Sequence, residues 1–164
     1  MATRRHVLRA LALTALGAWL PPEVSPIPRE DKEADLLSRI SRETNPVKRA
    51  KYEIRLARVK LLQAMEAREK GEIESSQKLL GAYLEQVKSA WATLQKTGRP
   101  AHKKPQGFKE LDIELREDAR YLEDLKHRFS FLDREPVEKI AEEVENLRAE
   151  VLKALFLPEE HKKQ

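Results

Sequence analysis

Few side chains in this chain have the types and the spacing that chemistry requires. Asp124 and His127 lie three residues apart, so a helix would place both on one face. A carboxylate-bridged di-iron site needs Glu-x-x-His motifs from two helices and two further glutamates, and this pair is one incomplete half of such a set. The other histidines are His6, His102 and His161, and none has a ligand partner at helical spacing. We therefore expect no metal, no cofactor, and a solvated face at Asp124 and His127.

The sequence also lacks the usual signs of nucleophilic catalysis. There is no cysteine, which excludes thiol catalysis, disulfides and cysteine-bound metals. No nucleophile elbow, phosphate-binding loop or zinc-ligand spacing occurs, and the many glutamates fall on polar faces of the expected helices. The sequence predicts that the protein is not an enzyme.

Basic side chains are concentrated in two stretches, 46–60 and 99–104, which could contact an anionic partner. The candidate residues are Lys48, Arg49, Lys51, Arg55, Arg58, Arg99, Lys103 and Lys104. Because Tyr52 is the only Phe, Tyr or Trp in the two stretches, they lack a series of rings for stacking on nucleobases, and nucleic acid is not expected as the ligand. Solvation, or pairing with acids of the same molecule, is the alternative for both stretches.

The N-terminus has the layout of an export signal. Three arginines are followed by the apolar run 10–20, which is too short for the roughly 20 residues that a membrane-spanning helix needs. Thr3-Arg4-Arg5 and Val7-Leu8 resemble a twin-arginine signal, and an ordinary secretory signal is the alternative. We expect residues 1–18 to be removed, which lowers the formal net charge from +4 to +1 because three arginines and no acid are lost.

Residues 19–28 hold four prolines and are expected to form a spacer. The whole chain is 37% charged and 5% aromatic, a composition that favours long amphipathic helices. The helical domain is expected over 29–157, followed by a polar tail over 158–164. The expected helices cover 29–43, 46–70, 72–97, 108–132 and a last segment that Asp133 caps and Pro158 ends. Asn45 and Pro46 mark one helix start, and Gly71 marks its end.

Apolar residues recur three and four positions apart in each long segment, which places them on one helix face. The stripes are Ala50, Ile54, Ala57, Leu61, Ala64 and Met65; Ile73, Leu80, Tyr83, Leu84, Val87, Trp91 and Leu94; Leu111, Leu115, Leu122, Leu125, Phe129 and Leu132; and Val137, Ile140, Val144, Leu147, Val151 and Leu155. The last stripe has the spacing of a coiled-coil seam. The predicted fold class is all-α, an antiparallel bundle of four long helices arranged as two helical hairpins, plus a short N-terminal helix.

Charge suggests which helices are neighbours. Residues 46–60 carry a net charge of +5 and residues 135–150 a net charge of −4. In an up-down-up-down bundle the first and last long helices are adjacent, so we expect these two segments to meet, either within one molecule or in a partner copy.

The segment 50–88 resembles uncharacterised bacterial exported domains built on a helical hairpin. The residues that carry this resemblance are Leu56-Ala57, Lys70-Gly71-Glu72 and Tyr83-Leu84. They also look like a single tetratricopeptide-type hairpin, although no 34-residue period follows. In size, export and helical character the chain is similar to small periplasmic chaperones of the Spy type, but it lacks their Leu-Thr-x-x-Gln motifs.

These observations predict a periplasmic or secreted protein without a membrane span in its mature chain. Its expected role is that of a non-catalytic interaction or scaffold module of the cell envelope, with a protein partner or self-association. Two alternatives remain open. One is a periplasmic holdase-type chaperone, and the other is a binder of anionic surfaces through residues 46–60 and 99–104.

Overall fold

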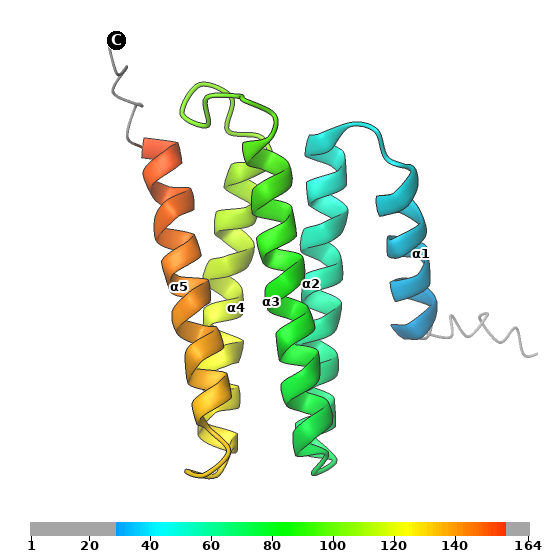
Figure 1. Ribbon diagram of the computed structural model, residues 1–164, viewed down its shortest axis with the longest axis vertical. Coiled ribbons are helices and arrows are strands. Elements are labelled where there is room, and N and C mark those ends of the chain that lie inside the picture. Colours follow the sequence, from blue (N-terminus) through cyan, green and yellow to red (C-terminus); the bar gives the residue numbers. More distant parts are fainter. Residues whose placement is uncertain (1–28, 157–164) are drawn as a thin grey trace, which may run out of the picture.

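The computed structural model describes residues 29–156, and every regular element within that range is an α-helix (Figure 1). The helices are α1 (Arg29–Arg42), α2 (Pro46–Glu69), α3 (Ile73–Gln95), α4 (Phe108–Arg128) and α5 (Glu135–Phe156). The predicted all-α class is confirmed. The predicted signal with Arg4 and Arg5, the spacer and the tail 158–164 lie outside the described residues. No helix of the described part has both the length and the apolar character needed to cross a bilayer.

Both ends of α2 are set by residues next to the helix, Asn45 at its start and Gly71 after its end. The Asn45 Oδ1 atom accepts two backbone N–H groups of the first turn, at 3.0 and 3.2 Å, and Pro46 occupies the first helical position. Gly71 follows the helix with a φ of +80°, and across it the Glu72 N–H donates to the Ala67 carbonyl at 2.9 Å. Both predicted boundaries are confirmed.

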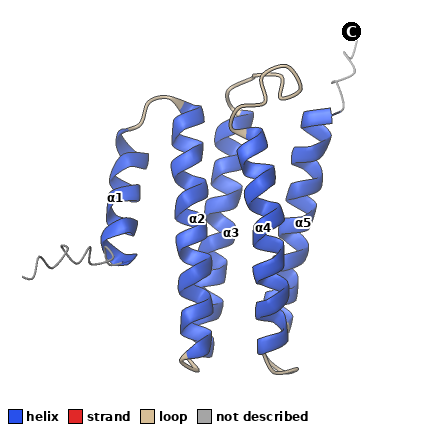
Figure 2. Ribbon diagram, turned by 180° about the vertical axis from the view of Figure 1, so that it is seen from behind, coloured by secondary structure: helices blue, strands red, loops and turns tan. Residues whose placement is uncertain are grey.

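The four long helices surround one core in the order α2, α3, α5, α4 (Figures 1 and 2). A short turn sends α3 back along α2, and another sends α5 back along α4. Between these two hairpins the neighbours run in the same direction, α2 beside α4 and α3 beside α5. Lys51 and Glu110, near the starts of α2 and α4, pair at 2.7 Å, and Glu69 and Arg128, near their ends, pair at 2.9 Å.

The expected adjacency of segments 46–60 and 135–150 within one molecule is wrong, because α2 and α5 lie diagonally across the bundle. Their meeting in a partner copy stays a prediction. The physical reason is that α4 supplies the acids that neutralise α2. Lys51 and Arg58 on α2 both pair with glutamates of α4. The acidic neighbour of α2 is therefore α4, whereas the net charges of the segments predicted α5.

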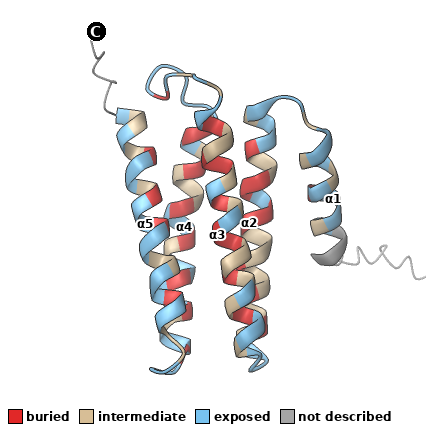
Figure 3. Ribbon diagram, viewed as in Figure 1, coloured by how far each residue is buried: buried red, intermediate tan, exposed pale blue. Residues whose placement is uncertain are grey.

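The core consists of the four predicted stripes, which face one another along the length of the bundle (Figure 3). Nearly every stripe residue is buried or packed against the buried cluster. Leu132 is the exception and is 88% exposed. Its placement in the fourth stripe is therefore wrong.

The fourth helix ends at Arg128 rather than at residue 132 because a side-chain turn replaces its last expected turn. The Ser130 hydroxyl donates to Asp133 Oδ2 at 2.6 Å, and the Asp133 N–H donates to the Ser130 carbonyl at 3.2 Å. Such side-chain bonds compete with the helix. Asp133 is thus engaged with Ser130, and Arg134 is the residue that directly precedes α5, with its carbonyl accepting from the Glu138 N–H at 3.0 Å.

The short helix α1 rests on α2 alone. Leu36 is buried, whereas Leu37 is half exposed. Glu33 fastens the helix to α2, since it pairs with Lys60 Nζ at 2.5 Å and accepts from Gln63 Nε2 at 3.0 Å. A helix of 14 residues is marginal alone, so this docking stabilises it.

Candidate functional site

The structure divides the predicted basic residues into a paired group and an unpaired group. In the paired group, Arg49 Nε lies 3.2 Å from Glu53 Oε1, Lys51 Nζ lies 2.7 Å from Glu110 Oε1, and Arg58 turns toward α4. Arg55 is exposed and lies 6.0 Å from the centre of the Tyr52 ring. These residues contribute to the packing of the protein on itself, which is the alternative that the sequence left open.

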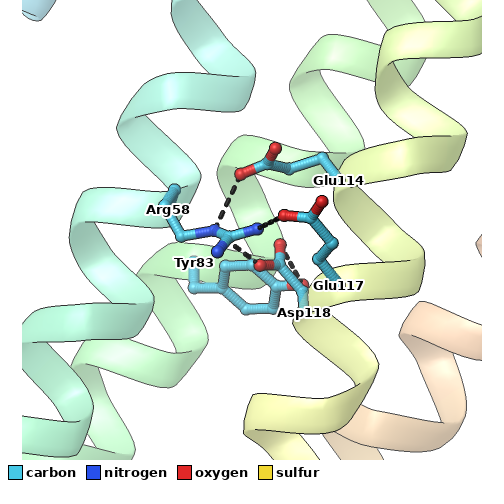
Figure 4. Close-up of polar contacts among 5 residues, drawn as sticks. All are labelled: Arg58, Tyr83, Glu114, Glu117 and Asp118. Carbon is cyan, nitrogen blue, oxygen red and sulfur yellow. Dashed lines mark hydrogen bonds and ion pairs between the residues drawn. The ribbon is translucent and has the colours of Figure 1, made fainter.

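Arg58 belongs to a polar cluster between α2, α3 and α4, which we call the Arg58 cluster (Figure 4). Its members are Arg58, Tyr83, Glu114, Glu117 and Asp118. Arg58 Nε lies 2.7 Å from Glu114 Oε1 and 2.8 Å from Asp118 Oδ1, and Nη2 donates to Glu117 Oε2 at 3.1 Å. The Tyr83 hydroxyl donates to Asp118 Oδ2 at 3.1 Å. Both Tyr83 and Asp118 are fully buried.

The single positive charge of Arg58 therefore faces three carboxylates and cannot neutralise all of them. Asp118 is the most deeply buried of the three. Burial raises the pKa of the Asp118 carboxyl to about 7, against the opposing charge of Arg58 and with the help of Glu114. Burial likewise holds the pKa of the Tyr83 hydroxyl well above its usual range, with a further contribution from Asp118. The cluster can take up or release one proton near neutrality, and it joins three helices.

Sequence reasoning missed the buried polar residues Glu53, Ser76 and Asp118. Asp118 left a visible signal, because the fourth stripe jumps seven positions from Leu115 to Leu122 and position 118 fills the gap on the same face. Ser76 left the same signal, because the third stripe jumps seven positions from Ile73 to Leu80 and position 76 fills the gap. Its hydroxyl donates to a backbone carbonyl of α2 at 2.7 Å.

Glu53 is the second buried carboxylate. Its Oε1 atom accepts from Arg49 Nε at 3.2 Å and from the Ser89 hydroxyl at 3.1 Å, while Oε2 is buried with no hydrogen-bond partner among residues 29–156. The bond from Ser89 ties α2 to α3.

The unpaired group lies at the end of the bundle where α2 and α4 begin and where α3 and α5 finish (Figure 1). We call it the cationic end and define it by Lys48, Lys96, Arg99, Lys103, Lys104 and Lys109. All are exposed except the half-buried Arg99, and none forms an ion pair with another described residue. Segment 96–109 contains five of these bases and no acid. The structure thus brings Lys48 of the first predicted stretch beside the second stretch.

Acids close to the cationic end already have partners. Glu110 pairs with Lys51 and also accepts from the Gly107 N–H at 2.6 Å, and Glu43 accepts from the Asn45 N–H at 2.9 Å. No described acid forms an ion pair with any of the six bases.

The loop 96–107 that carries most of these bases is held in a defined shape. Ala101 is buried, and the N–H groups of Lys103 and Lys104 donate to the Pro100 carbonyl at 3.1 and 2.9 Å. Gly107 has a φ of +89°, and a Cβ atom there would lie 2.5 Å from a methyl group of Leu94. Only glycine fits this position without a shift.

Asp124 and His127 do not converge on other ligands. Asp124 pairs with Arg128 at 2.7 Å, and His127 is exposed with its Nε2 atom 3.2 Å from Glu123 Oε1. Among residues 29–156 no group of three or more histidines and acids is arranged to hold a metal ion.

Comparisons of the chain with protein-family models, with curated proteins and with solved structures find no match. The Arg58 cluster and the cationic end are therefore the two features of the molecule from which its function is inferred.

Proposed function

We propose that this chain is a non-catalytic interaction module of the cell envelope, exported by its N-terminal signal, that binds an anionic partner through the cationic end. The observation that carries this proposal is the set of six bases at one end of the molecule that form no ion pair with described residues. Like charges held close together repel one another, and an anionic ligand removes that repulsion. The Arg58 cluster is buried and serves the scaffold in this proposal.

The scaffold is proposed to be a bundle of two antiparallel hairpins that stay joined in solution. Three kinds of contact support it. The apolar stripes share one core, the Arg58 cluster links α2 and α3 to α4, and Trp91 Nε1 on α3 donates to Glu150 Oε2 on α5 at 3.1 Å. A rigid scaffold lowers the entropy lost when the cationic end binds.

The test is retention on heparin, a sulfated polysaccharide that serves as a general anionic probe. Lys103→Ala with Lys104→Ala should elute at lower salt than the wild type, because each lost base weakens attraction to the anionic resin. Lys78→Ala with Lys139→Ala is the matched control. It removes the same charge from the opposite end, and its elution should move less. Equal elution of the two double variants would contradict the proposal.

Export is tested separately by the intact mass of the protein from fractionated cells. A product that lacks about 18 N-terminal residues in the envelope or secreted fraction supports the proposal. A full-length product in the cytoplasm would contradict this part of it.

A second candidate function, a holdase that shields unfolded proteins, is favoured by the α4–α5 turn. Phe131 and Leu132 are 87% and 88% exposed there. Exposed apolar side chains of this kind are binding sites for other apolar segments when they are contiguous. Suppression of the aggregation of citrate synthase that is lost in Phe131→Ser with Leu132→Ser would support it. No suppression by the wild type at equimolar protein would reject it.

A further inference from the structure

We propose that the cationic end docks on a lipid bilayer that contains acidic phospholipids, an inference that rests on the proposed function and names its partner. The bases of this end are spread over the start of α2, the end of α3, the following loop and the start of α4. These segments lie together at one end of the bundle (Figure 1). A bilayer offers many phosphate groups in one plane, which matches charges spread over one end of the bundle.

An exposed aromatic residue adds a second observation. Phe156, the last residue of α5, is 75% exposed at the same end of the molecule. Lys153, one turn earlier, is also exposed. Aromatic side chains enter the interface between lipid headgroups and acyl chains, while neighbouring lysines stay with the phosphates. The combination favours a membrane surface over a purely polar anion.

The aromatic residues under the loop argue against single-stranded nucleic acid. Proteins bind single-stranded nucleic acid partly by stacking its nucleobases on accessible aromatic side chains. Trp91 and Phe108 lie below the loop, but both are buried, and they pack against each other edge to face at 5.9 Å between ring centres. Neither ring can stack on a nucleobase. Phe156 is exposed at the same end, but a single ring does not provide the succession of stacking platforms that single strands use.

The shape of the loop keeps its charges directed outward. The buried Ala101 and the turn at Pro100 fix the backbone next to Lys103 and Lys104. Since this loop is held before binding, less conformational entropy is lost on the membrane than for a flexible basic tail.

The opposite end would not compete for an acidic bilayer. Glu135, Glu138 and Glu142 are exposed in the first two turns of α5, far from the loop 96–107 along the bundle. Their charge is repelled by acidic lipids. We therefore infer an end-on orientation, with the helices standing on the membrane and the α4–α5 turn pointing away from it.

The experiment measures co-sedimentation of the full-length protein with vesicles of phosphatidylcholine alone and with vesicles that contain 30% phosphatidylglycerol, over a series of NaCl concentrations. The wild type should bind the acidic vesicles, and its affinity should fall as salt rises. Each basic residue near an acidic surface changes affinity by about fivefold. Lys103→Ala with Lys104→Ala should therefore bind about twenty-five-fold more weakly. Phe156→Ala should bind more weakly without a change in salt dependence.

The matched control is again Lys78→Ala with Lys139→Ala, which should bind acidic vesicles like the wild type. Every protein in the series keeps the same N-terminus, so its arginines do not affect the comparison. Circular dichroism at 222 nm confirms that each variant is folded. Equal affinity of the two double variants, equal binding to neutral and acidic vesicles, or tighter binding to single-stranded DNA than to vesicles would overturn the lipid proposal. If the lipid proposal is overturned but heparin retention still depends on Lys103 and Lys104, the proposed binding of an anionic partner stands without a membrane.

Discussion

Asp118 should make the stability of this protein fall as the pH rises through neutrality. The unfolded chain loses this proton near the ordinary pKa of 3.8, whereas burial raises the pKa of the folded carboxyl to about 7. The stability that this group contributes is therefore complete below about pH 4 and is lost as the pH rises through about 7. This direction is the reverse of ordinary acid denaturation.

The size of the effect follows from the same two values. One pKa unit corresponds to about 1.4 kcal/mol. Across the interval from pH 5 to pH 8 the linkage relation gives a loss of about 3 kcal/mol in the free energy of unfolding. The acids whose pKa is lowered, such as Glu33 beside Lys60 and Glu110 beside Lys51, act in the opposite sense. Their contributions are lost below their ordinary pKa of 4.5, so they do not mask Asp118 in this interval.

Asp118→Asn isolates the effect because asparagine resembles the protonated carboxyl in size and in having no charge. The free energy of unfolding of the variant relative to that of the wild type should increase by about 3 kcal/mol from pH 5 to pH 8. The assay is urea unfolding followed by circular dichroism at constant ionic strength. Asp112→Asn, which changes a partly exposed partner of Arg148 at 3.1 Å, is the control and should keep the wild-type pH dependence. Wild-type stability that rises from pH 5 to pH 8, or the same slope in Asp118→Asn, would refute the reasoning.

Five further substitutions test the packing. Gly107→Ala should lose about 2 kcal/mol in urea unfolding, because its φ of +89° strains any other residue and its Cβ meets Leu94; Gly81→Ala, in mid-helix with nothing within 4 Å, should instead gain up to about 1 kcal/mol. Leu80→Asp or Val144→Asp should abolish the cooperative thermal transition, because each buries an unpaired charge. Arg58→Met should lower stability by several kcal/mol at pH 8 and by less at pH 5, since it leaves Asp118 without its cation; equal losses at the two pH values would count against the Arg58 cluster.

Much of the fold could be predicted because the information is local. The cap at Asn45, the left-handed Gly71 and the stripes spaced three and four residues apart each depend on a few neighbouring residues. The end of α4 was misplaced because Leu132 continues the helical spacing, while the turn depends on bonds between Ser130 and Asp133 that spacing does not reveal. Periodicity describes which face a residue would occupy in a helix, and it does not say where the helix stops.

The candidate sites were harder to predict because they depend on which helices are neighbours. The net charges of segments 46–60 and 135–150 predicted that α2 and α5 are neighbours, whereas Arg58 of α2 pairs with Glu114 and Asp118 of α4. Net charge over a segment is the same whether its charges are paired or not, so it could not separate the engaged Arg58 from the unpaired Lys103. That distinction needs the three-dimensional arrangement.

The arrangement of the hairpins also explains why the charge of this molecule is divided between its two ends. Because α2 and α4 run in the same direction, the acids of α4 lie beside the bases of α2 and neutralise them, as in the pair of Lys51 with Glu110. The acidic first half of α5 then lies at the far end, where it cannot reach the loop 96–107. A reversed second hairpin would place Glu138 and Glu142 near that loop and cancel its charge. The bases left without partners are thus a consequence of helix direction, and helix direction is what gives the proposed anionic partner a single end to bind.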